Sequence, residues 1–229
     1  VAVASGRGPM LRTLLESETF YGASVEEALS YAKAADNGGL TPAHYACCVG
    51  YPKLVRALAN TGIDIDCKDP QGRTLLHYAV CSQKAFCVEA LLSMSANPSI
   101  RDVEGFAALH HAALNDFGNE IIAMCKSERT DIDQCNSNGE TALHIAADYG
   151  NARAVKELCA CAANVGFSNP DGNTPLHIAC MSGHDEIVEI LLEYDADPNV
   201  RNLDGQTPIG FARLGNHGGV IAKFRGKFL

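Results

Sequence analysis

The sequence predicts an all-α repeat protein, a solenoid of helical pairs joined by extended loops. Three observations predict this class. A six-residue window of similar composition recurs about every 33 residues, and a glycine stands two residues before each copy. Each copy is followed by a second stretch whose apolar residues recur at helical spacing. Self-similarity at such a period is typical of solenoids, in which stacked units bury the faces that one unit alone leaves exposed.

The six windows define the repeats. They begin at positions 41, 74, 107, 141, 174 and 207, and read TPAHYA, TLLHYA, AALHHA, TALHIA, TPLHIA and TPIGFA. The preceding glycines are Gly39, Gly72, Gly105, Gly139, Gly172 and Gly205. The windows predict repeats at about 41–73, 74–106, 107–140, 141–173, 174–206 and 207–229.

The repeat at 174–206 illustrates how each unit is expected to fold. Its threonine is a good N-cap, and the proline after it suits the first helical position because its missing N–H would be unpaired there. A short helix then buries Leu176 and Ala179. A second helix is expected over 184–194, with Ile187, Val188, Leu191 and Leu192 on one stripe. Residues 195–206 predict an extended hairpin that turns at Gly205.

Small residues at the last window position predict close helix packing. These are Ala46, Ala79, Ala112, Ala146, Ala179 and Ala212. The windows resemble the ankyrin repeat, whose signature T-P-L-H-x-A has a 33-residue period. This resemblance covers residues 37 to 229. It implies a single domain, 1–229, of about seven helix–turn–helix repeats with β-hairpin loops.

The two ends of the chain depart from the regular pattern. Residues 1–17 align with 178–194, which predicts a first repeat, at about 1–40, that begins halfway through its first helix and belongs to a longer protein; a tag is the alternative for the first few residues. Its hairpin is longer by 11 residues, with a capping box at Ser24–Glu27. This insertion is either a packed decoration or a partner-specific finger. The last repeat, with Gly210 in place of histidine, is either a cap or the point where a longer array was cut.

A further irregularity lies in the repeat at 107–140, which is one residue longer than the others. We place the extra residue near Asn115–Phe117, between the two helices of this repeat. It predicts a longer loop there.

Composition excludes several classes of function. The net charge of −9 argues against nucleic acid as the main ligand, and no apolar stretch is long enough to insert into a membrane. The ten cysteines form no C-x-x-C pair, which favours reduced thiols in the cytoplasm or nucleus. No nucleophile elbow, phosphate loop or metalloprotease motif is present, so we expect no enzymatic activity and no cofactor.

Five of the eight histidines occupy the same window position: His44, His77, His110, His144 and His177. One ring per stacked unit does not converge as a metal site requires, so we expect structural roles and no metal. The ankyrin resemblance implies that each ring bonds the capping threonine and the neighbouring hairpin backbone. At Ala107 this threonine is missing, and we expect that turn to be weaker.

Binding is expected where residues differ from repeat to repeat. In ankyrin proteins a partner usually meets the hairpin tips and the exposed, concave side of the first helices. Large apolar residues at such positions, which are enriched in binding hot spots, are Phe106, Leu114, Tyr149 and Met181. The predicted contact set is completed by Asn115 and by a polar rim of Arg101, Glu104, Glu140, Asp148 and Asp171. The alternative is that these are ordinary scattered surface residues.

A modification site follows from the same resemblance. Ankyrin hairpins can be hydroxylated on an asparagine that lies eight residues after a leucine in an acidic-aliphatic context. Leu191 and Asn199 have this spacing, although Pro198 replaces the usual valine or isoleucine.

The sequence therefore predicts a noncatalytic, monomeric scaffold that binds a protein partner. Residues 6–20 and 87–113 resemble the ankyrin-repeat regulatory subunits of protein phosphatase 6, which implies phosphatase subunits as partners. The alternatives are the ankyrin module of a membrane protein or larger enzyme, such as a palmitoyltransferase or a channel, and a nuclear inhibitor or cofactor.

Overall fold

The computed structural model describes residues 34–228, which form α-helices in consecutive pairs. The chain comprises two compact units, Val1–Ala96 and Asn97–Leu229, each described by itself. The described helices of the first unit are α3 (Pro42–Val49), α4 (Pro52–Asn60), α5 (Leu75–Cys81) and α6 (Ala85–Ser93). Those of the second are α7 (Ala108–Leu114), α8 (Gly118–Cys125), α9 (Ala142–Tyr149), α10 (Ala152–Ala160), α11 (Pro175–Ser182), α12 (Asp185–Glu193), α13 (Pro208–Leu214) and α14 (Gly218–Phe228).

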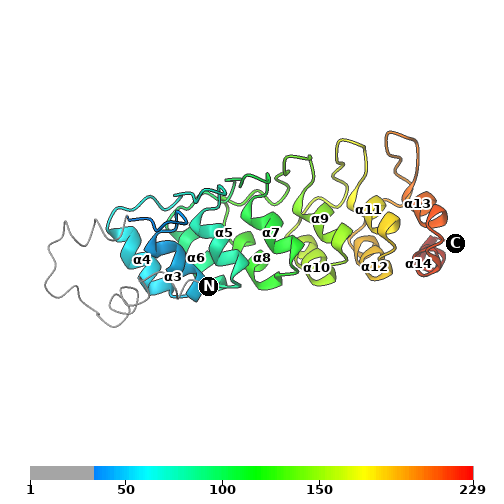
Figure 1. The fold of residues 1–229 in the computed structure, drawn as a ribbon. Coiled ribbons are helices and arrows are strands. Elements are labelled where there is room, and N and C mark those ends of the chain that lie inside the picture. The colour runs from blue at the N-terminus through cyan, green and yellow to red at the C-terminus, as the bar shows by residue number, and fades with distance from the viewer. Residues whose placement is uncertain (1–33, 229) are drawn as a thin grey trace, which may run out of the picture. The chain divides into compact units, whose positions relative to one another are not determined.

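The helices of the second unit form two layers (Figure 1). The first helices of the repeats, α7, α9, α11 and α13, pack one against the next and are called the inner helices. The second helices, α8, α10, α12 and α14, form the other layer and are called the outer helices. The loops between repeats project beside the inner helices (Figure 1). In the first unit, α3 packs on α5 and α4 on α6 in the same manner. The predicted all-α solenoid is confirmed.

Small residues allow the inner helices to approach closely. The alanine at the last window position has no exposed surface in any of the six windows. The outer helices supply the larger side chains: Ile187, Val188 and Leu191 on α12 are at most 1% exposed, as predicted. Because buried residues come from both the inner and the outer helices, the core lies between the two layers. Burial of each large apolar side chain contributes about 1.5–3 kcal/mol to the free energy of unfolding.

The inner helices begin and end as the sequence predicts. In α9, Thr141 is the N-cap, and its side chain accepts a hydrogen bond from the backbone N–H of His144. The helix ends at Gly150, whose φ of 76° lies in the left-handed region that glycine enters without steric cost. In the equivalent position Gln83, Asp116 and Asn216 adopt the same conformation, with φ near 57°.

The loops contain less β structure than a hairpin implies. Within residues 34–228 the β pairing consists of two isolated antiparallel bridges, Arg101 with Ala107 and Cys135 with Thr141. Each loop turns back after only a few residues, and side chains rather than a strand ladder satisfy its backbone N–H groups, as described below.

The predicted position of the extra residue, near 115–117, is wrong. The connection from α7 to α8 has three residues, as does that from α13 to α14, and every described outer helix begins 11 residues after the start of its window, so no residue is inserted before α8. The extra residue lies instead within 126–130, after α8. In the other four repeats within residues 41–206 this turn contains one left-handed residue, such as Ala162 or Asp195, whereas no residue of 126–130 has a positive φ.

Three further features bear on the predictions. All ten cysteines are free thiols, and burial raises the pKa of Cys87 to about 11 and of Cys180 to about 12. Every helix within residues 34–228 is too short or too polar to cross a lipid bilayer. The predicted first repeat and the capping box at 24–27 lie outside the described residues, apart from the segment 34–40.

Candidate functional site

An Asp or Asn side chain organises each loop between repeats. It lies five residues before each window: Asp36, Asp69, Asp102, Asn136, Asn169 and Asn202. In the last loop, Asn202 Oδ1 accepts hydrogen bonds from the backbone N–H groups of Asp204 (3.1 Å) and Gln206 (2.9 Å). The Gln206 carbonyl accepts from the Asn202 N–H at 3.0 Å, which closes the loop. These bonds hold the loop tips in fixed positions.

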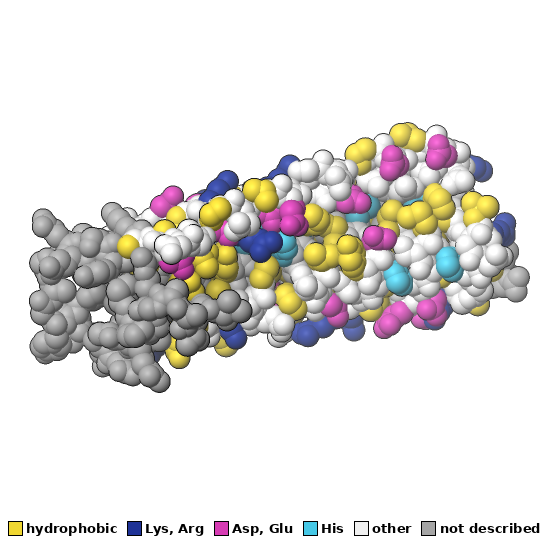
Figure 2. Space-filling model, viewed as in Figure 1, with side chains coloured by type: hydrophobic (Ala, Val, Ile, Leu, Met, Phe, Trp, Pro, Cys, Tyr) yellow, Lys and Arg dark blue, Asp and Glu magenta, His cyan; other side chains and the backbone are white. Residues whose placement is uncertain are grey.

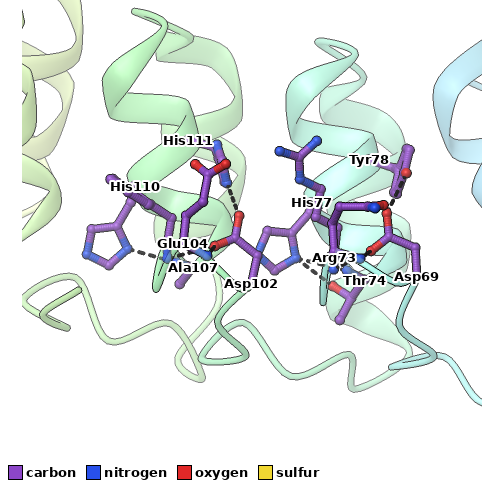
Figure 3. A network of polar contacts seen from close by, with 12 residues as sticks. Asp69, Arg73, Thr74, His77, Tyr78, Asp102, Glu104, Ala107, His110 and His111 are labelled. Atoms are coloured by element: carbon purple, nitrogen blue, oxygen red, sulfur yellow. Dashed lines mark hydrogen bonds and ion pairs between the residues drawn. The ribbon is translucent and has the colours of Figure 1, made fainter. Parts of the chain in front are cut away.

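The acidic loops each hold a second donor (Figure 3). Asp69 Oδ2 accepts a hydrogen bond from the Tyr78 hydroxyl at 2.7 Å, and in the second unit Asp102 Oδ2 lies 2.7 Å from His111 Nε2. Asp102 and His111 are both buried. Burial and the Asp69 carboxylate raise the pKa of Tyr78.

The amide loops pair differently. Ile145 and Ile178 occupy the positions that correspond to Tyr78 and His111. An amide has one oxygen, and in Asn202 this oxygen is occupied by the loop N–H groups, while its Nδ2 donates to Asn173 Oδ1 at 2.9 Å. A buried carboxylate needs a further hydrogen-bond donor for its second oxygen. An amide has no second oxygen, so the residue beside it on the inner helix can be apolar.

The window histidines connect each inner helix to the next loop. His144 Nδ1 accepts a hydrogen bond from the Thr141 backbone N–H (3.3 Å) and lies 2.8 Å from Thr141 Oγ1. Its Nε2 lies 3.0 Å from the carbonyl oxygen of Asn173, in the loop that leads to the following repeat. This pattern requires a neutral ring with its proton on Nε2. In the same unit, Nε2 of His110 and of His177 reaches the carbonyls of Gln134 and Gln206.

Burial keeps these rings neutral. It lowers the pKa of His110 to about 4 and lowers the pKa of His44, His144 and His177. In the first unit, Nδ1 of His44 and of His77 accepts from the N–H of its own N-cap threonine at 3.1 Å. These ring nitrogens are hydrogen-bonded to backbone N–H groups.

Large apolar side chains are exposed at the C-terminal ends of the inner helices. Tyr149 on α9 is 62% exposed, Met181 on α11 is 45% exposed, and Leu214 on α13 is 70% exposed. Leu114, at the end of α7, is half-buried. We call these four residues the apolar stripe. In Figure 2, hydrophobic side chains are exposed over the region of α9 to α13, with acidic side chains on both sides.

Polar contacts fix the backbone beneath the apolar stripe. The exposed Asp148 carboxylate accepts a hydrogen bond from Ser182 Oγ at 3.0 Å and so lies between α9 and α11. His184 Nε2 lies 2.9 Å from the Asp148 carbonyl, and His217 Nε2 lies 3.1 Å from the Met181 carbonyl. Both histidines directly precede an outer helix, α12 or α14. Their rings bond the backbone at the end of the inner helix of the preceding repeat.

Most of the predicted contact residues are exposed: Arg101, Glu104, Asn115, Asp148, Tyr149, Asp171 and Met181. The helix packing brings Leu114, Tyr149 and Met181 onto consecutive inner helices. Phe106 and Glu140 are half-buried. The ring of Phe106 packs against His110 and His111, with centroid distances of 5.9 and 5.6 Å. Phe106 therefore forms part of the framework, contrary to the expectation that it is solvated.

The second unit exposes three large apolar residues that were not among the predicted contact residues: Val103, Leu203 and Leu214. Leu214 belongs to the degenerate last repeat, yet it stands seven residues after its window start, as do Leu114 and Met181. Val103 and Leu203, at two loop tips, are 72% and 78% exposed. Comparing the same position across all repeats would have identified Leu214.

The asparagine predicted as a modification site lies in an accessible loop. Asn199 is exposed, and its backbone N–H donates to Asp197 Oδ1 at 2.8 Å. Leu191, eight residues earlier, is fully buried in α12.

Comparisons with known proteins agree with this geometry. A family model described as ankyrin repeats (3 copies) matches residues 54–126 and 109–202, more than half of the chain. No curated protein matched the sequence.

Among solved structures, the ankyrin repeat domain of Bcl-3, a member of the IkappaB protein family, is 25% identical, with a TM-score of 0.79 over 94% of this chain and 92% of that chain. An ankyrin repeat domain from Acinetobacter baumannii AYE is 25% identical, with a TM-score of 0.71 over 81% and 96%. The ankyrin repeat protein EF0377, at 23% identity and a TM-score of 0.71 over 80% and 96%, shows similarity of fold alone.

The substitution Ala107→Thr is expected to stabilise the protein by about 1 kcal/mol, because it restores the N-cap hydroxyl that His110 lacks. Threonine is accommodated at the equivalent positions of the next two repeats, where Thr141 and Thr174 are 0% and 2% exposed. Urea unfolding measures the effect. Ala107→Val, which has the same shape without the hydroxyl, is the control; an equal gain in both variants would contradict the explanation.

The free energy of unfolding is expected to decrease when the pH is lowered from 7.5 to 5.0. The folded state lowers the pKa of His110 from 6.5 to about 4, so the unfolded chain binds a proton more readily in this range. The stabilisation is complete above pH 6.5 and decreases as the pH falls towards 4; His110 alone contributes a loss of ~2 kcal/mol at pH 5.0. Urea unfolding at the two pH values tests this, and His110→Gln should show a smaller pH dependence. A wild-type stability that does not change with pH would refute it.

Proposed function

The chain belongs to the ankyrin-repeat family, and from this premise we propose that it is a noncatalytic scaffold that binds a protein partner through its inner helices and loops. The apolar stripe is the observation that carries the proposal. Tyr149, Met181 and Leu214 are exposed on neighbouring helices, and contiguous apolar surface is typical of interaction sites. Asp148, Asp171 and Glu104 supply a polar rim.

Rigidity supports the same function. The loops are closed by side-chain hydrogen bonds, and the inner helices are held at both ends, so little conformational entropy is lost when a partner binds. The window histidines, which would be the natural acid–base residues, are neutral and engaged with the backbone. This supports a noncatalytic role. The assignment of residues 1–229 to one domain of seven repeats, acting as a monomer, belongs to the same proposal.

For the partner, we propose subunits of a protein phosphatase, with this chain in a regulatory or scaffolding role in the cytoplasm or nucleus. The support comes from the sequence of residues 6–20 and 87–113, which resembles the ankyrin-repeat subunits of protein phosphatase 6. The free thiols support a reducing compartment.

A second candidate function is that of an inhibitor or cofactor. The similarity to the ankyrin domain of Bcl-3, a member of the IkappaB protein family, extends over nearly the whole of both chains and favours this alternative. An origin within a larger membrane protein or enzyme is the third alternative, and it rests on no further observation.

We also propose that Asn199 is hydroxylated. Its side chain lies in an exposed loop, eight residues after the buried Leu191. Protein expressed in animal cells should yield a peptide with one added oxygen atom on Asn199, detected by mass spectrometry. The variant Asn199→Gln should lack this mass shift, and unmodified wild-type peptide would refute the proposal.

An affinity pull-down from cell lysate, analysed by mass spectrometry, tests the scaffold function. The variant Tyr149→Ala/Met181→Ala should lose partners that the wild type retains, because aromatic and apolar anchors carry much of the binding energy at interfaces. Both residues are exposed, so we expect folding to be unchanged, which circular dichroism verifies. Phe86→Ala, at a residue that is 77% exposed on α6, is the matched control.

Two outcomes separate the candidates. Recovery of phosphatase subunits with the wild type and with Phe86→Ala, but not with the double variant, would support the phosphatase role. Partners that bind the double variant as well as the wild type would exclude the apolar stripe as the binding surface.

A further inference from the structure

The net charge of the chain is divided unequally between its two units. Residues 97–229 contain 18 acidic and 10 basic residues, a net charge of −8, whereas residues 1–96 contain 9 acidic and 8 basic residues. The second unit, which carries the apolar stripe, therefore accounts for nearly all of the net charge of −9. A surface of this charge attracts a basic partner and repels an acidic one.

Some of the acidic groups of this unit lie on the same helices and loops as the apolar stripe. Asp148 precedes Tyr149 on α9, and its carboxylate accepts a hydrogen bond from Ser182, which follows Met181 on α11. Asp171 and Asp204 are exposed in the adjacent loops. The exposed basic residues of these loops and inner helices are Arg101, Arg201 and Arg213; Arg201 donates to the Gly205 carbonyl, and Arg213 lies in the last turn of α13. Acidic groups thus dominate beside α9 and α11.

The spacing of the apolar stripe restricts the conformation of a peptide that could follow it. Adjacent packed helices lie about 8–10 Å apart, and Met181 and Leu214 occupy the same position on the neighbouring helices α11 and α13, so this spacing applies to them; Tyr149 stands one residue further along α9. A polyproline II segment advances about 3.1 Å per residue and presents every third side chain on one side, about 9.3 Å apart. A β-strand presents every second side chain, at about 6.6 Å, and so does not match this spacing.

We propose that the apolar stripe binds an extended, basic peptide segment in a polyproline II conformation, with an apolar side chain at every third residue and Lys or Arg between them. The apolar side chains contact Tyr149, Met181 and Leu214 in turn, and a basic side chain reaches Asp148. This inference rests on the proposed protein-binding function and specifies the chemistry of the segment that is bound.

Synthetic peptides test the inference directly. The probe is a fluorescein-labelled 12-residue peptide, (Leu-Lys-Pro)₄, titrated with the complete chain and measured by fluorescence anisotropy. One control peptide has the same composition with its leucines at alternate positions. A second control replaces each lysine with glutamate. We expect binding of the probe to be at least tenfold tighter than that of either control, and to weaken as salt is added.

Protein variants locate the site. Tyr149→Ser/Met181→Ser should weaken binding of the probe at least tenfold, and Asp148→Asn about threefold, with a smaller dependence on salt. The matched controls are Phe86→Ser, an exposed apolar residue on α6, and Glu193→Gln, an exposed acidic residue on α12; both should bind as the wild type does. Thermal unfolding verifies that every variant is folded.

The outcomes distinguish this inference from the proposed function. No binding of the probe at millimolar concentration, or equal binding of the two leucine spacings, would overturn the inference. The same holds if the double variant binds the probe as tightly as Phe86→Ser does. If partners in the pull-down still require Tyr149 and Met181, the scaffold function stands without this inference. If the partners in the pull-down bind the double variant as well as they bind the wild type, the apolar stripe is excluded as the binding surface, and both the inference and the proposed site are refuted.

Discussion

The structure depends on one buried imidazole ring in each of five repeats. In His144, one nitrogen fixes the start of its own helix by accepting the N-cap N–H, and the other reaches the loop that leads to the following repeat. The same ring therefore sets local structure and connects neighbouring units. This requires the neutral form, because a proton on Nδ1 would oppose the N–H donor of the cap. Burial supplies that condition by lowering the pKa, so the packing that surrounds the ring also maintains its hydrogen bonds.

The loops show how a single atom alters the packing around a residue. Asp102 has a second carboxylate oxygen that is bonded to His111, whereas Asn202 donates instead to a neighbouring amide. The inner helix supplies a polar group in the first case and an apolar group in the second. Loops of both kinds are closed by the same backbone bonds, so they present fixed surfaces although their sequences differ. A binding surface built on such loops can vary from repeat to repeat while the fold remains constant.

Much of the fold could be predicted from the sequence, because the same capping, packing and turn residues recur in each repeat. The recurring six-residue window located the first helix of every described repeat, although Ala107 and Gly210 depart from its Thr–His pair, and the alanine positions identified the close contacts between helices. The extra residue was predicted in the wrong loop for a physical reason. The left-handed residue of this turn need not be glycine, as Ala162 and Asp195 show, so the sequence does not reveal that the turn after α8 differs from the others. Phe106 was expected in solvent because its contacts with two histidine rings depend on tertiary packing. Leu214 was missed because the loss of histidine at position 210 made its repeat look unlike the others.

The histidine bonds also join each repeat of the second unit to both of its neighbours. The window ring of His177 holds the Gln206 carbonyl, in the loop that leads to the next repeat. The ring of His217 bonds in the other direction and holds the Met181 carbonyl at the end of the preceding inner helix. Local opening of the repeat at 207–229 therefore breaks the bond of His217 and loosens the loop that His177 holds, but it leaves the bonds of His110 and His144 intact. Resistance to unfolding should therefore be shared between adjacent repeats and decrease with distance along the chain.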